Sequence, residues 1–285
     1  MKLLLVLILI VFSCLSSSVF AFDWEKLHET ADKITLIEAQ EMLKSNEGSP
    51  DVLYVVALVY LNEYKVAQAK ALFERILQVS PGTIEAQWGL AEVLRRGYSL
   101  KKSREMLREI IISNPDFSPA YITLGYIEFS LKNYKEAVRL AAIVINQGHE
   151  VVDGSNYARA YLILAGAKGM IADKSGPLSK AFHGLQVFPN LNRAKKLKPE
   201  SPGVYYGLGS FYLLAPAIAG GNIIKAKEYL EKAIKLDSNL IDAYIRLAQV
   251  YKAQGDMDKF NEYLSLALEK DPQNYLANEI IDSLK

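Results

Sequence analysis

The side chains that could do chemistry in this sequence are few and scattered. The histidines His28, His149 and His183 stand far apart, and Cys14 is the only cysteine. A zinc site needs three or four closely spaced Cys, His, Asp or Glu ligands, and none accompanies His183 at helical spacing. The sequence also lacks nucleophile-elbow, zinc-protease and phosphate-loop motifs. We therefore expect no enzyme and no cofactor or metal; a hydrolase or transferase would require carboxylates that converge in a cleft.

Composition narrows the class of partner. The 285 residues are 51% hydrophobic and carry 33 Lys and Arg against 32 Asp and Glu. Nucleic-acid binding relies on clustered positive charge that displaces counterions from phosphates, and a net charge of +1 gives no such field. A single cysteine excludes a disulfide framework. Gly220-Gly221-Asn222 opens a helix and could receive an anion on free N–H groups, but Asn222 as an ordinary N-cap is the simpler interpretation.

The first 21 residues have the features of a secretory signal peptide. Lys2 precedes an apolar run over residues 3–12, and small residues follow before Phe22. The run is shorter than the roughly 18 residues of a membrane-spanning helix. Residues 11–14, Val-Phe-Ser-Cys, resemble the lipobox of bacterial lipoproteins, in which the cysteine is lipidated. Cleavage after Ala21, lipidation at Cys14 and an uncleaved anchor are the alternatives, and each predicts export to the periplasm or cell envelope.

An internal repeat of 34 residues organises most of the chain. Pro81 and Pro115 stand 34 residues apart and close units at 50–83 and 84–117, and the window 118–151 continues the register. Pro199 sets the start of a unit at 202, and Pro272 closes one that begins at 241. An apolar residue recurs at the seventh position of the units, and small residues recur at the eighth and twentieth. The eighth-position residues are Ala57, Ala91, Gly125, Gly209 and Ala248.

The repeated pattern has a physical explanation in paired helices. Each unit holds two stretches with apolar residues at helical spacing, separated by a short turn. Two antiparallel helices approach closely only where side chains at their crossing are small, which the eighth and twentieth positions provide. The proline ends the second helix because the residue before it avoids helical backbone. One such hairpin cannot cover its own apolar face, so neighbouring units must stack, which favours an all-α array over a non-repetitive bundle.

These recurring positions resemble the tetratricopeptide repeat (TPR) family in period, in paired small residues and in terminal proline. The resemblance implies an all-α, right-handed superhelical solenoid of antiparallel helix pairs, with two irregular units. We expect Pro189 to break or kink the second helix of the first irregular unit. The expected plan is a signal segment at 1–21 (or a lipoprotein signal ending at Cys14), an N-terminal helix pair at 22–49, three units at 50–151, an irregular unit with an insertion at 152–201, two units at 202–274, the first with a long loop, and a capping helix at 275–285.

The family resemblance also implies a binding groove, because the first helices of such units line a concave surface. The partner-binding residues expected from this register are Tyr54, Trp88, Glu92, Tyr126, Phe129, Tyr206, Arg246 and Gln249. Aromatic side chains supply large, rigid contact areas at low entropy cost. The alternative is that these rings pack against adjacent helices. Family members that bind a partner's C-terminal carboxylate use Lys and Asn at fixed positions of the first helices. This chain has only one cation at those positions, Arg246, so we expect no such carboxylate clamp.

We therefore expect an exported, non-catalytic scaffold for protein–protein interaction in the bacterial cell envelope. It would bind a protein or peptide partner, no nucleic acid, and a membrane only through a lipid or uncleaved N-terminal anchor. The alternative is a periplasmic small-ligand-binding or transporter-accessory protein, in which residues 173–193 and 214–222 close a pocket near Phe182, Phe211 and Pro216. The loop at 214–222 is similar to a feature of exported bacterial TPR lipoproteins associated with solute transporters.

Overall fold

The computed structural model describes residues 23–283, and within this range the chain forms helices and no strand. The expected signal segment, including Cys14, lies outside the described residues. Among residues 23–283, no helix has the length and apolarity that crossing a bilayer requires. The helices are α1 (Trp24–Lys33), α2 (Leu36–Ser45), α3 (Pro50–Asn62), α4 (Val66–Val79), α5 (Ile84–Arg96), α6 (Leu100–Ser113), α7 (Ser118–Ser130), α8 (Tyr134–Gln147), α9 (Gly154–Asp173), α10 (Pro177–Gly184), α11 (Val187–Leu197), α12 (Pro202–Leu214), the 3₁₀ helix η1 (Ala217–Ala219), α13 (Ile223–Leu236), α14 (Ile241–Ala253), α15 (Met257–Lys270) and α16 (Tyr275–Asp282).

Side-chain caps fix several helix starts. Thr35 and Glu38 form a capping box before α2, in which each side chain bonds the backbone N–H of the other residue. Asn222 Oδ1 accepts hydrogen bonds from the N–H groups of Ile224 and Lys225 at 3.1 and 3.0 Å. The Gly-Gly-Asn segment therefore contains the ordinary N-cap of α13, and its first free N–H groups are already engaged.

Small residues lie where paired helices cross, as the repeat predicts. A Cβ added to Gly209 of α12 would stand 2.6 Å from Leu230 Cγ of α13, closer than real Cβ atoms approach. Gly125 of α7 differs, because the first atom its Cβ would meet is Ile163 Cδ1 of α9, at 3.2 Å, with Leu140 of its own unit at 3.9 Å. The expectation that Gly125 serves mainly the helix crossing within its unit is thus wrong, since the tighter contact is with the next unit.

The predicted interruption of the irregular unit is present, but it precedes Pro189. Helix α10 ends at Gly184 and α11 begins at Val187, so Pro189 lies in the first turn of α11. A proline is tolerated there because N–H groups of a first helical turn have no carbonyl partner to lose. The insertion therefore folds as a separate short helix against α9, which is itself extended to 20 residues.

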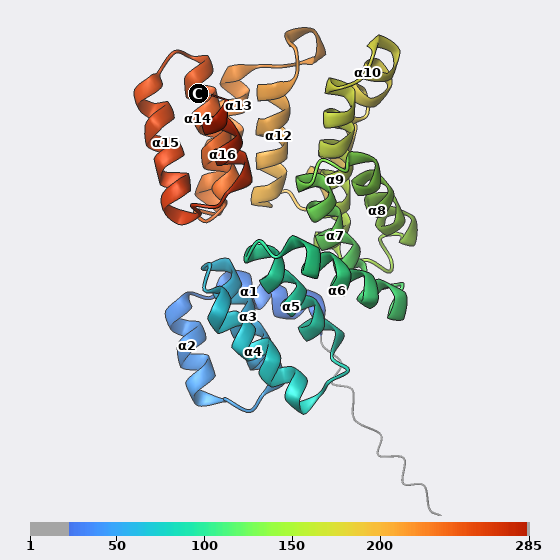
Figure 1. Cartoon of the computed structure of the whole chain (residues 1–285), viewed down its shortest axis with the longest axis vertical. Helices are drawn as coiled ribbons and strands as arrows, with labels where there is room; N and C mark the ends of the chain where they lie inside the picture. Colours follow the sequence, from blue (N-terminus) through green and yellow to red (C-terminus); the bar gives the residue numbers. More distant parts are fainter. Residues whose placement is uncertain (1–22, 284–285) are drawn as a thin grey trace, which may run out of the picture.

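The solenoid closes on itself. Figure 1 shows α1–α6 at one end of the molecule and α12–α16 at the other, with α7–α11 connecting them along one side. The turns inside the first three units carry Tyr64, Tyr98 and Lys132, which are 34 residues apart and have positive φ angles of 55°, 59° and 64°. The last unit has Gly255 at this position, with φ 81°, and glycine is the residue that adopts this backbone without a steric penalty.

Each of the three non-glycine turn residues reaches the C-terminal half. Tyr64 Oη donates to the Asn239 carbonyl at 3.3 Å, and Tyr98 Oη donates to the Asp271 carboxylate. Lys132 Nζ forms an ion pair with Glu279 at 3.0 Å. We call these three contacts the seam. Because one turn of the superhelix rests on the next along the seam, the inner sides of both halves face a shared interior.

Candidate functional site

Helix α1 occupies the inner side of the first two units. The Trp24 ring stacks on His28 with centroids 4.1 Å apart and meets Trp88 edge-on at 4.8 Å. His28 Nε2 lies 3.2 Å from Tyr54 Oη. Tyr54 and Trp88, both expected to line an open groove, are consequently buried. In this part of the solenoid, the chain's own N-terminal helix takes the place that a partner helix would fill.

Packing of α1 against α3 and α5 changes the protonation of His28, a residue of α1. Desolvation, reinforced by the nearby Arg159 guanidinium, lowers the pKa of His28 from 6.5 to about 3. The imidazole is therefore neutral at physiological pH. It acts as a packing and hydrogen-bonding group between α1 and α3, and it carries no charge toward a ligand.

A buried polar chain links the first units. Trp88 Nε1 donates to Thr123 Oγ1 at 3.0 Å, and Thr123 Oγ1 donates to Glu92 Oε1 at 2.7 Å. Arg95 closes the chain with two nitrogens on the Glu92 carboxylate, at 2.8 and 3.0 Å. Burial opposes ionisation of Glu92, but Arg95 and Arg96 outweigh it and lower its pKa to about 2. Glu92, expected to face a partner, instead holds α5 to α7.

The open part of the interior is lined by tyrosines from separate units. Tyr126 of α7 is 38% exposed, Tyr275 of α16 is exposed to a similar extent, and Tyr206 of α12 is half-buried. Burial raises the pKa of Tyr126, and the nearby Arg159 and Arg95 offset part of this rise. Burial also raises the pKa of Tyr206. All three hydroxyl groups therefore stay protonated and can donate hydrogen bonds at physiological pH.

Arginines accompany these rings, and two of them have donors to spare. Arg159 is exposed and forms no hydrogen bond or ion pair with any other residue of the range 23–283. Arg246 donates to Gln249 Oε1 at 2.7 Å, while its buried Nε has no hydrogen-bond partner in the described part of the chain. Burial raises the pKa of the neighbouring Asp242, and its hydrogen bond with Asn274 and the Arg246 charge counteract this only in part.

We define the inner surface as the open set formed by these groups from five units and the cap. Its members are Arg95, Tyr126, Arg159, Tyr206, Arg246 and Tyr275. Guanidinium groups present planar forks that match carboxylates, and their hydrogen bonds to carboxylates are among the strong ones in proteins. The inner surface is therefore suited to a carboxylate-bearing segment that also offers apolar contact to the tyrosine rings.

The expected groove residues divide between this surface and the core. Tyr126, Tyr206 and Arg246 lie on the inner surface, and Gln249 orients Arg246. Phe129 instead packs edge-on to Tyr134, with centroids 5.5 Å apart. The additional members are Arg95, Arg159 and Tyr275, and the last two were missed because they lie in an irregular unit and in the cap.

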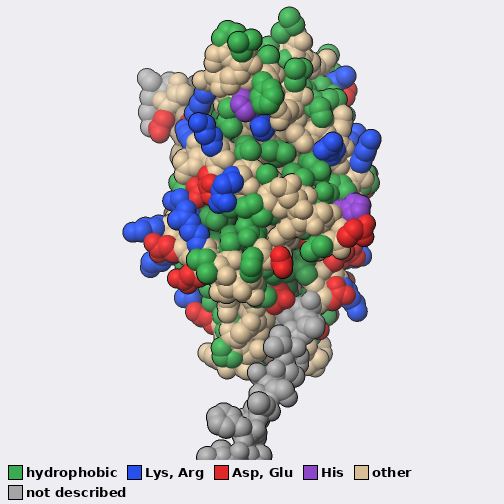
Figure 2. All heavy atoms as spheres, turned by 90° about the vertical axis from the view of Figure 1, so that its right-hand side faces the viewer, with side chains coloured by type: hydrophobic (Ala, Val, Ile, Leu, Met, Phe, Trp, Pro, Cys, Tyr) green, Lys and Arg blue, Asp and Glu red, His purple; other side chains and the backbone are tan. Residues whose placement is uncertain are grey.

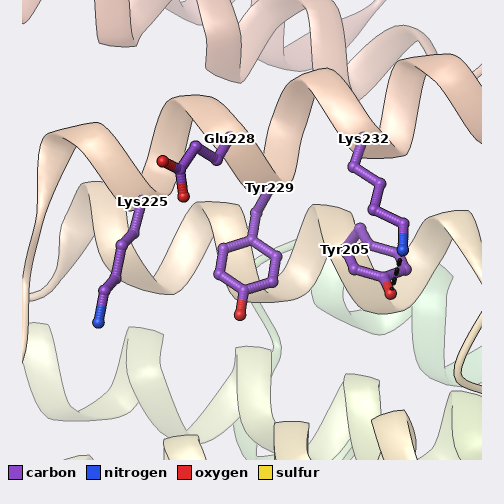
Figure 3. Close-up of a pocket in the computed structure, with 5 residues that line it drawn as sticks. All are labelled: Tyr205, Lys225, Glu228, Tyr229 and Lys232. Atoms are coloured by element: carbon purple, nitrogen blue, oxygen red, sulfur yellow. Dashed lines mark hydrogen bonds between the residues drawn. The ribbon is translucent and has the colours of Figure 1, made fainter.

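A second candidate lies on the outer surface between α12 and α13. Tyr205, Lys225, Glu228, Tyr229 and Lys232 line a pocket of about 260 Å³ (Figure 3). Lys232 Nζ donates to Tyr205 Oη at 2.6 Å and lies over its ring, and Tyr229 stacks on Tyr205. These groups mainly satisfy one another, so we regard the pocket as cation–π packing of α13 on α12. Within residues 23–283, no group of three or more His, Cys, Asp or Glu side chains is placed to hold a metal ion.

Comparison with known proteins agrees with the fold of stacked helix pairs seen in the structure. Residues 217–278 match the family model described as tetratricopeptide repeat. This segment of the chain carries tetratricopeptide repeat sequence. A tetratricopeptide repeat protein from Parabacteroides merdae has the same fold at 15% identity and TM-score 0.55, with 90% of this chain and 95% of that chain covered. The Cut9–Hcn1 hetero-tetramer of APC/C superposes at 12% identity and TM-score 0.63, over 90% of this chain and 47% of that one.

At these identities, the likeness to solved structures shows the fold alone. No curated protein matches the sequence. The predicted all-α TPR solenoid is confirmed by the family match and by these two structures. Arrays of this kind present extended concave surfaces that bind proteins and peptides, which fits a scaffold for protein–protein interaction.

Proposed function

We propose that this protein is an exported TPR scaffold that binds a protein partner of the bacterial cell envelope on its inner surface, without catalysing a reaction. The secretory features of residues 1–21 support export. The repeat array supports partner binding, since stacked helix pairs create long surfaces rather than a compact catalytic cleft.

The observation that carries the proposal is a pair of arginines in the interior that keep hydrogen-bond donors without acceptors. Arg159 has no hydrogen-bond or ion-pair partner within residues 23–283, and Arg246 keeps a buried Nε without one. Burying the Arg246 Nε donor without a partner is costly, and the exposed Arg159 has its donors free, so a ligand that supplies acceptors at these two positions is stabilised. The exposed ring of Tyr126 adds an aromatic contact. The preferred partner is an extended or helical segment with acidic and apolar residues.

The small-ligand alternative receives less support. It requires the two insertions to enclose an apolar pocket near Phe182, but that ring is 64% exposed and Ile218 at the loop tip is fully exposed. Side chains that point outward do not wall a cavity. The insertions therefore extend the outer surface of the molecule instead of closing its interior.

A recovery experiment tests the proposal. The tagged protein is isolated from gently cross-linked envelopes, together with the double variant Arg159→Gln/Arg246→Gln. Loss of two charge-assisted hydrogen-bonding groups, each worth about 1.5 kcal/mol or more, should lower partner recovery at least tenfold. The matched control is Arg75→Gln/Arg139→Gln, which removes two outer arginines. Equal recovery with both double variants, or a partnerless wild-type protein, would rule the inner surface out.

A further inference from the structure

Positive charge is concentrated in one stretch of this balanced chain. Residues 174–227 contain eight Lys and Arg and one Glu, whereas the rest of the sequence has 25 Lys and Arg against 31 Asp and Glu. The stretch contains both insertions that break the 34-residue rhythm: helix α10 and the loop at 214–222. A net charge near zero for the whole chain conceals this asymmetry.

The fold places the two insertions at a free end. The turns inside the first three units are covered by the C-terminal half along the seam, which leaves no room for insertions there. The equivalent turns of the next two units lie at the opposite end of the molecule, where Figure 1 shows α10 and the α12–α13 loop projecting side by side at the top. Both insertions therefore extend the same edge of the solenoid.

The projecting insertions expose large apolar side chains. Leu178, Phe182 and Leu185 are 90%, 64% and 78% exposed, and their spacing of four and three residues places them on one face of α10 and its C-cap residue, Leu185. Leu214, Ile218 and Ile224 are exposed on the loop and its flanks. We call these six residues the crest. Figure 2 shows hydrophobic side chains gathered at this end, with Lys and Arg side chains just below them.

Aromatic contacts join the helices α11 and α12 that carry the two parts of the crest. Phe188, three residues after Leu185, lies 5.4 Å from the Phe211 ring between centroids. A Cβ on Gly220 of the loop would stand 3.8 Å from Phe211. Gly220 has a φ of 98°, which lets the loop turn back over this ring. Both parts of the crest therefore adjoin the packed pair α11 and α12.

Lysines surround the crest. Lys168 Nζ lies 5.8 Å from the centroid of Phe182, and Lys225 Nζ lies 5.4 Å from that of Tyr212. Lys180 is exposed on α10, and Lys174 is exposed just before it, with its Nζ 5.2 Å from the centroid of the Tyr134 ring of α8. The acidic residues nearest in sequence are Asp173, before the insertion, and Glu228, one helical turn into α13.

We propose that the crest docks on the surface of an anionic lipid bilayer. Exposed apolar side chains flanked by Lys characterise surfaces that insert shallowly among lipid head groups, where the cations meet anionic lipids. A protein partner fits less well, because apolar hot spots of protein interfaces are seated in pockets and surrounded by a sealing rim, whereas Ile218 stands at the tip of a projecting loop. This contact is separate from any anchor in residues 1–21 and from partner binding on the inner surface.

Tryptophan fluorescence tests the docking at the crest itself. The chain has two tryptophans, and Trp88 is buried, so the wild-type signal can be subtracted from that of a Phe182→Trp variant. Vesicles of phosphatidylglycerol and phosphatidylcholine with brominated acyl chains should shift the added emission to shorter wavelength and quench it. Pure phosphatidylcholine vesicles should have little effect. The control variant Ile112→Trp, at an exposed position on α6 far from the crest, should not respond to either.

A charge variant completes the test. Lys174→Glu/Lys180→Glu/Lys225→Glu should weaken the quenching of Phe182→Trp by anionic vesicles at least tenfold, since each cation near an anionic surface contributes to binding. Lys101→Glu/Lys102→Glu on α6 should leave it unchanged. Absence of quenching, or equal quenching by neutral vesicles, would overturn the proposal. The proposal would also be overturned if a protein covers the crest in envelopes and vesicles do not quench Phe182→Trp. In that case the crest would be the binding surface for that protein.

Discussion

Tyr98 Oη donates a hydrogen bond to the Asp271 carboxylate, and this contact joins residues 173 positions apart in the chain. Burial and this hydrogen bond raise the pKa of Tyr98, so the hydroxyl remains a donor. Tyr98 also has the left-handed backbone that Gly255 adopts in the last unit. Non-glycine residues adopt it at a cost of roughly 1–2 kcal/mol. The seam contacts offset that cost and hold the superhelix closed.

The seam can be tested without disturbing its turns. The triple variant Tyr64→Gly/Tyr98→Gly/Lys132→Gly keeps residues that favour positive φ and removes only the contacting side chains. We expect the two ends of the superhelix to separate, with a larger radius of gyration in small-angle X-ray scattering and unchanged helix content by circular dichroism. An unchanged radius of gyration would show that the seam does not hold the two ends of the superhelix together.

The pH dependence of stability should report the burial of His28. Its pKa is about 3 in the folded protein and 6.5 in the unfolded chain. The unfolded state therefore binds more protons between these values, and stability falls as the pH drops below about 6.5. At pH 5.5 the loss from this residue should be about 1.4 kcal/mol relative to neutral pH.

Urea unfolding of wild type and His28→Gln at pH 7.5 and 5.5 measures the contribution of His28 to the pH dependence of the unfolding free energy. The variant should show a smaller pH dependence by about that amount, because glutamine cannot take up the proton. Identical pH dependence in the two proteins would mean that His28 is not desolvated where α1 packs on α3 and α5.

The repeat register predicted most of the fold. The 34-residue spacing of prolines and small residues identified the helix pairs, because crossing helices need small side chains at fixed positions. It could not show that α1 would lie over Tyr54 and Trp88, since α1 precedes the first unit and has no repeat register. It also missed the seam, because side chains such as Tyr98 contact a residue 173 positions further along the chain, far beyond one repeat.

Helix crossing at Gly209 gives a stability prediction. Gly209→Ala would place a Cβ 2.6 Å from Leu230 Cγ and 3.2 Å from the Ala226 carbonyl oxygen, so α12 and α13 must separate. We expect a loss of about 1–3 kcal/mol in thermal or urea unfolding. Gly82→Ala is the matched control, since nothing lies within 4 Å of its added Cβ; it should change stability by less than about 0.5 kcal/mol. Equal unfolding stability of the two variants would show that α12 and α13 do not approach closely at Gly209.

The buried carboxylate of Glu92 should contribute far more to the stability of the fold than a surface carboxylate. Glu92→Gln removes the negative charge that Arg95 and Arg96 face at a site shielded from solvent. We expect a loss of about 3 kcal/mol, as for other buried pairs that lose one partner. Glu136→Gln, which breaks an outer pair with Arg139, should cost less than about 1 kcal/mol. Similar melting temperatures for the two variants would argue against the buried polar chain.

The candidate site was only partly predictable. Tyr126, Tyr206 and Arg246 could be predicted because the first helices of their units keep the positions of the repeat. Arg159 stands at the second position of a unit whose start was blurred by the loop at 152–154, and Tyr275 follows Ile241 by one full repeat of 34 residues. A register extended through the irregular unit would have included Arg159, whereas Tyr275 stands at the first position of its repeat, which is not one of the expected groove positions.

Site-specific photo-cross-linking in living cells tests partner binding on the inner surface most directly. A photoreactive p-benzoylphenylalanine replaces Tyr126 on the inner surface or Ile112 on the outer surface of α6. We expect the Tyr126 probe to capture one defined envelope protein, and the capture to disappear in the Arg159→Gln/Arg246→Gln background. The Ile112 probe should capture none. Capture at Ile112 but not at Tyr126, or capture at Tyr126 that is unaffected by loss of both arginines, would contradict the account.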